Sequence, residues 1–152
     1  MASAVRVAGE AAEVARAEAQ AVMAALSDER RRGRLADLVA AVEEGQVAGD
    51  DADALGELLE LGLQTGRLRS IYGPGAEQAA RGLFRRLPQG RELAQSTQKL
   101  NEALGVLSGQ RLERVTVHSV GPGEYGITIA TEGAELSLYL GRSGARLSTI
   151  GA

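Results

Sequence analysis

Apolar residues recur at helical spacing from the start of the chain to about residue 109. In the first stretch, residues 4–26, alanine dominates, and the apolar positions follow one another at alternating intervals of three and four residues. These intervals are typical of the seam of a heptad pattern, so we predict a helix that packs against another helix, in its own chain or in a second copy. The candidate interface residues are those of the seam: Val5, Ala8, Ala12, Ala15, Ala19, Val22 and Leu26.

Further helices are predicted after this one. Each has apolar residues at helical intervals, the second and third helices begin at Asp, and the segments end at Gly or Pro. Ser27-Asp28 is the candidate N-cap of the second helix, and Pro88 is expected to end the fourth. The segments are residues 28–44, 50–65, 76–87 and 93–109, which brings the total to about five helices.

From Arg111 onward the apolar period changes from helical spacing to two. Three runs alternate apolar and polar residues, and Glu132-Gly133 is a two-residue hairpin connection that pairs Ile129 with Leu136. A turn over residues 141–144 then brings Leu147 opposite Leu138 in a fourth strand. We therefore predict an α+β fold, in which about five helices are followed by a four-stranded antiparallel β-meander packed on them. Its apolar face carries Val115, Val117, Tyr125, Ile127, Ile129, Leu136, Leu138 and Leu140.

The domain organisation follows from this change of period. Residues 1–109 form the helical region and residues 110–152 the β-meander, and we expect the two to pack as one compact unit. Residues 1–26 have a second possible role as an arm outside the core, which would favour oligomerisation.

Composition narrows the class of protein. The chain of 152 residues has no Cys, which excludes disulfides and thiolate chemistry and favours a reducing compartment. The N-terminus lacks the apolar stretch of an export signal, and charged residues interrupt every apolar run before it reaches the length of a membrane helix. We expect a cytoplasmic protein with no membrane contact. Arginine far outnumbers lysine beside abundant Ala and Gly, a bacterial-type composition.

Charge is small in total but unevenly distributed. Residues 35–65 contain eight carboxylates and no basic residue, whereas residues 66–91 contain six arginines and Glu77 alone. Two such blocks can pair within the chain, can attract another copy, or can simply be solvated helix faces. A shorter basic run, Arg30-Arg31-Arg32-Gly33-Arg34, precedes the acidic block. Nucleic acid is not the expected partner, because the pI is about 5.3 and no aromatic residues are interleaved with these arginines for stacking on bases.

Two groups of residues are candidate ligand sites. The turn with Gly73 and Gly75 before a helix, near Arg67, Arg69 and Arg81, resembles in a general way the helix N-termini that bind anions, although it lacks the residues of a P-loop. The polar side of the sheet has the single histidine, His118, and Tyr139 beside several hydroxyls. This side is equally the solvated face of an antiparallel sheet. Neither group has the ligand spacing of a metal site, and we expect no cofactor and no metal.

These observations favour a protein without catalytic activity. Acid, base or nucleophilic catalysis needs titratable groups brought together, and the chain offers few of them. Our first hypothesis is an interaction or assembly protein that associates with itself and with another protein. The alternative is a sensor that binds a small ligand or an anion at one of the two groups above. An enzyme that uses His118 with Tyr139, or a Glu as general base, is the third possibility.

Overall fold

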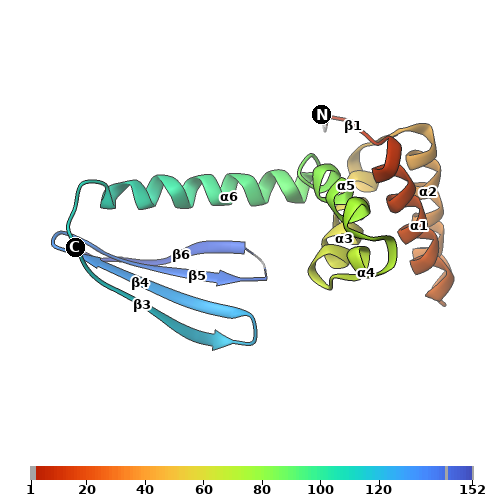
Figure 1. Cartoon of the computed structure of the whole chain (residues 1–152). Coiled ribbons are helices and arrows are strands. Elements are labelled where there is room, and N and C mark those ends of the chain that lie inside the picture. The colour runs from red at the N-terminus through yellow and green to blue at the C-terminus, as the bar shows by residue number, and fades with distance from the viewer. Residues whose placement is uncertain (1–2, 143, 152) are drawn as a thin grey trace. The chain divides into compact units, whose positions relative to one another are not determined.

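The structure, a computed structural model of the whole chain, describes residues 3–142 and 144–151. Its α-helices precede a four-stranded antiparallel sheet, which confirms the α+β class (Figure 1). The chain divides into two compact units, residues 1–91 and residues 92–152. The division falls inside the last helix instead of after it. Residues 1–91 are called the N-terminal unit below, and residues 92–152 the C-terminal unit.

Helices make up most of the N-terminal unit. Asp28 caps the second one as predicted, because its carboxylate accepts a hydrogen bond from the backbone N–H of Arg31 at 3.1 Å. Pro88 starts α6 instead of ending the preceding helix, since the first turn of a helix does not need the N–H that proline lacks. The helices are α1 (Gly9–Ala25), α2 (Glu29–Glu44), α3 (Gly49–Gln64), α4 (Arg67–Tyr72), α5 (Pro74–Phe84) and α6 (Pro88–Leu104).

A small sheet that the sequence did not predict joins the starts of α1 and α3. Strands β1 (Val5–Arg6) and β2 (Gln46–Val47) pair antiparallel, and each leads through the same three residues, Val-Ala-Gly, into its helix. The backbone is nearly the same in both copies, with φ of +61° at Gly9 and +52° at Gly49. Residues with a side chain rarely adopt this left-handed backbone conformation, so glycine is required at both turns. The two helices therefore begin in equivalent ways on neighbouring strands.

The core of the N-terminal unit is continuous. Each of its helices α1 to α5 contributes side chains that are almost completely buried, and leucine supplies the largest of them. Gly62 of α3 lets Leu68 approach closely, because a Cβ on Gly62 would lie 2.8 Å from Cγ of Leu68. The fully buried leucines are Leu38, Leu55, Leu59, Leu68, Leu83 and Leu87.

The C-terminal unit consists of the rest of α6, a 3-10 turn (Gly105–Leu107) and a meander in the order β3-β4-β5-β6. The predicted register is confirmed: Ile129 pairs with Leu136, and Leu138 with Leu147. A bulge in the last strand then puts Thr149 opposite Ser137. Ser143, in the predicted last turn, lies outside the described residues. The strands are β3 (Leu112–Gly121), β4 (Glu124–Thr131), β5 (Glu135–Gly141) and β6 (Gly144–Gly151).

The apolar face of this sheet is unevenly covered. In β5, Leu136 is 0% exposed and Leu138 is 7% exposed, whereas Val117 in β3 is 63% exposed. Helix α6 contacts the sheet at the edge formed by β5 and β6. There Leu93 of α6 lies so close to Gly144 that a Cβ on this glycine would be 2.8 Å from Cδ1 of Leu93. We predicted that the whole apolar face packs on helices. The β5 part of the face is buried, and the β3 part is open because no described element of the C-terminal unit itself lies over it.

Candidate functional site

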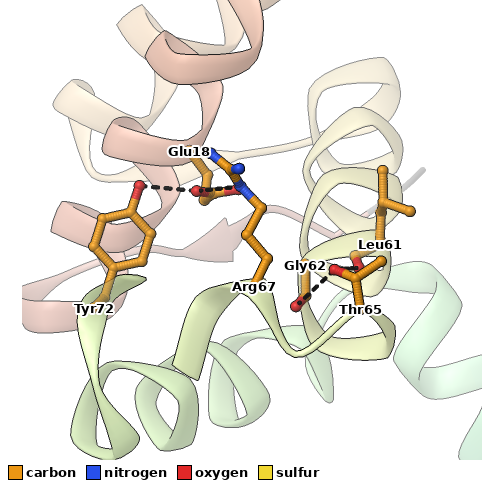
Figure 2. Close-up of polar contacts among 6 residues, drawn as sticks. All are labelled: Glu18, Leu61, Gly62, Thr65, Arg67 and Tyr72. Atoms are coloured by element: carbon orange, nitrogen blue, oxygen red, sulfur yellow. Dashed lines mark hydrogen bonds and ion pairs between the residues drawn. The ribbon is translucent and has the colours of Figure 1, made fainter. Parts of the chain in front are cut away.

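A buried carboxylate in the N-terminal unit is the most enclosed polar group that the described residues contain. Glu18 of α1 is 2% exposed, and Figure 2 shows two side chains of the α4 segment converging on it. Nε of Arg67 donates to both carboxylate oxygens, at 3.1 and 3.2 Å, and the hydroxyl of Tyr72 donates to Oε1 at 2.8 Å. A charge removed from water in this way is tolerated only when it is paired and hydrogen-bonded. The three residues thus attach α4 to α1.

The phenol of Tyr72 is fixed in its protonated, donating form. Burial, followed by the hydrogen bond to the Glu18 carboxylate, raises the pKa of Tyr72 above its usual 10.0. An ionised phenolate would face the Glu18 carboxylate, so the proton stays on the oxygen. Because Glu18 already accepts hydrogen bonds from two side chains of its own chain, this cluster stabilises the fold and is not the site that we favour for a ligand.

Glu18 was missed at the level of sequence, although a signal was present. It lies three residues after Ala15 and four before Val22, both seam positions, so its carboxylate is on the apolar stripe of the first helix. A carboxylate at such a position requires a partner inside the protein. Two candidates, Arg67 and Tyr72, are close together in the sequence but about fifty positions away, and spacing alone does not bring them to α1.

The structure does not gather the predicted anion-binding arginines around the Gly73-Pro74-Gly75 turn. Arg67 is bound to Glu18, and Nη2 of Arg81 is paired with Oε1 of Glu77, one turn away on the same helix, at 2.9 Å. The exposed Arg69 lies in the last turn of α4. Glu10 occupies the vicinity of the turn itself, since a Cβ on Gly75 would lie 3.5 Å from its Oε1. A carboxylate of the chain therefore sits where an anion would approach the start of α5.

His118 and Tyr139 do lie in one cross-strand row on the polar side of the sheet. His118 pairs with Gly126, and Gly126 pairs with Tyr139, so a glycine separates the two rings. The imidazole of His118 lies over this glycine: a Cβ there would be 2.2 Å from its Nε2. The guanidinium carbon of Arg146 lies 4.5 Å from the centre of the Tyr139 ring.

Tyr139 has its own partner on this side. A hydrogen bond with Glu124, and after it partial burial, raises the pKa of Tyr139 above its usual 10.0. The row thus contains an imidazole, a neutral phenol and a guanidinium on a sheet surface, next to a hydroxyl pair in which Thr128 and Ser137 are 3.2 Å apart. These groups can donate hydrogen bonds to a polar molecule. The described residues show no cavity that encloses them.

The predicted interface seam of α1 faces its own unit. Val5, Ala15 and Ala19 are in the core, and Ala12 and Val22 pack against it. Ala8 is exposed and Leu26 is half-buried. Since most of the seam is covered by its own chain, it is not the surface on which we base a function.

The exposed apolar surface lies in the C-terminal unit instead. On the apolar face of the sheet, Val115, Val117 and Tyr125 are 50%, 63% and 47% exposed, and their neighbours Ile127 and Ile129 are half-buried. These five residues of β3 and β4 are called the open half of the apolar face. Such a contiguous exposed apolar surface is a candidate site of association.

The acidic block at 35–65 and the basic block at 66–91 do not pair with each other. Of the ion pairs that the described residues form, none joins the acidic block at 35–65 to the arginines at 66–91. Arg30, Arg31, Arg32 and Arg34 are all exposed in the first turns of α2. The described residues contain no cluster of His, Asp or Glu that would hold a metal ion, and no helix among them has the length and apolar character to span a membrane.

Comparison with protein-family models, with curated proteins and with solved structures finds no match to this chain.

Proposed function

We propose that this chain is a non-enzymatic interaction or assembly protein that binds a protein partner through the open half of the apolar face. The observation that carries the proposal is the contrast within one face of one sheet. Leu136 and Leu138 are buried, whereas Val115 and Val117 are at least half exposed. Covering such side chains with an apolar partner surface releases water from them, which is the main driving force of protein association.

Binding of a partner would also stabilise the C-terminal unit. Its buried apolar residues among those described are Leu100, Leu136 and Leu138, which is a small core for a unit of its length. Small cores give marginal stability, and a partner that binds only the folded form stabilises it. Association would thus complete the core of the sheet.

The anion-sensor alternative has weaker support. Arg67 and Arg81 hold carboxylates of their own chain, and Glu10 lies beside Gly75. The row with His118 and Tyr139 is the better candidate for a small polar ligand, and it stays a prediction.

Site-specific photocrosslinking tests the proposal. A benzophenone amino acid is placed at Val117, in the open half, and in a matched protein at Thr116, the next residue, whose side chain is on the opposite face of β3. Both full-length proteins are irradiated in the cells that naturally make the chain, and the adducts are identified by mass spectrometry. We expect a discrete protein adduct at position 117 and none at 116. Equal adducts at both positions, or none at 117, would contradict the proposal.

A further inference from the structure

No further inference is drawn: the strongest candidate, the surface of α2 on which Arg30, Arg31, Arg32 and Arg34 are exposed in the first turns and Glu43 and Glu44 in the last, has opposite charges at its two ends, but nothing in the structure shows what covers it.

Discussion

The N-terminal and C-terminal units bury their apolar residues to very different extents. In the N-terminal unit, eighteen described residues form one buried hydrophobic cluster, and the large apolar residues that stay exposed are Leu61 and Ile71. In the C-terminal unit the proportions are reversed. Among its described residues, the buried apolar ones are Leu100, Leu136 and Leu138, whereas the large exposed ones are Leu93, Val106, Leu112, Val115, Val117, Val120, Tyr125 and Ile150.

This difference shows that the N-terminal unit buries most of its large apolar side chains within itself, whereas the C-terminal unit leaves most of its own exposed. The helices of the N-terminal unit surround a shared centre, and even its buried charge, Glu18, is satisfied within the unit. The sheet of the C-terminal unit has two faces, and its apolar face is covered in part. We therefore expect the C-terminal unit, which has the proposed binding surface, to be the less stable of the two.

The largest expected effect comes from removing a core residue of the C-terminal unit. Leu136→Ala should lower the unfolding free energy of this unit by about 2–5 kcal/mol, enough to unfold a unit with so few buried residues. Ile150→Ala is the matched control, because Ile150 pairs with Leu136 but is 64% exposed. The measurement is hydrogen exchange at the amides of β5. Protection in Leu136→Ala equal to that in Ile150→Ala would contradict the expectation that Leu136 holds the C-terminal unit folded.

The N-terminal unit should stay folded after a similar truncation in its core. Leu59→Ala removes a side chain of α3 that is 0% exposed and should also cost about 2–5 kcal/mol, but the remaining core should hold the helices folded. Leu61→Ala, two residues along the same helix and 60% exposed, should change stability by less than about 0.5 kcal/mol. Thermal unfolding followed by circular dichroism measures both. Similar melting temperatures for the two variants would contradict the burial described for this unit.

The smallest expected effect is that of the polar cluster. Tyr72→Phe removes the hydrogen bond to Glu18 and should lower the unfolding free energy by about 1.5 kcal/mol at neutral pH, as expected for a bond to a charged acceptor. Tyr125→Phe, at an exposed phenol, should change it by less than about 0.5 kcal/mol. Denaturant titrations provide the values.

The same variant tests the pKa of Tyr72. Because the folded-state pKa is raised, the folded protein holds the phenol proton more tightly than the unfolded chain above the usual value of 10.0. The stabilisation is complete below that pH and is lost as the pH rises through the folded-state value. The wild type should thus lose stability more steeply than Tyr72→Phe in alkaline solution. Parallel curves for the two proteins above pH 10 would show that Tyr72 ionises as an ordinary exposed tyrosine.

Much of the fold could be predicted from the sequence, because its elements follow local rules. The period-two alternation and the Glu132-Gly133 turn were sufficient for the register of the meander. Helix α4 was missed because six residues are too few to show a period, and β1 and β2 because two-residue strands have no alternation. The extent of burial on the apolar face was also missed. Val117 and Leu138 are both apolar positions in alternating strands, and only the position of α6 makes Leu138 buried and Val117 exposed.

The surface that we propose differs from the seam predicted from the sequence for a similar reason. A heptad seam such as that of Ala15 and Ala19 shows that a helix packs, but not on what, and here its own unit covers it. The open half of the apolar face follows from an imbalance between the sheet and the helix available to cover it. That imbalance belongs to the three-dimensional arrangement and has no local sequence signal.

The ring of His118 over Gly126 makes the C-terminal unit easy to observe. Since the chain has one histidine, its imidazole protons give a single, directly assignable set of resonances in a nuclear magnetic resonance spectrum. Ring currents should shift the α-protons of Gly126 as long as β3 and β4 stay in register. Val117, in the open half, is the residue next to this histidine. The protein thus has a built-in spectroscopic reporter, free of any label, on the strand whose association is in question.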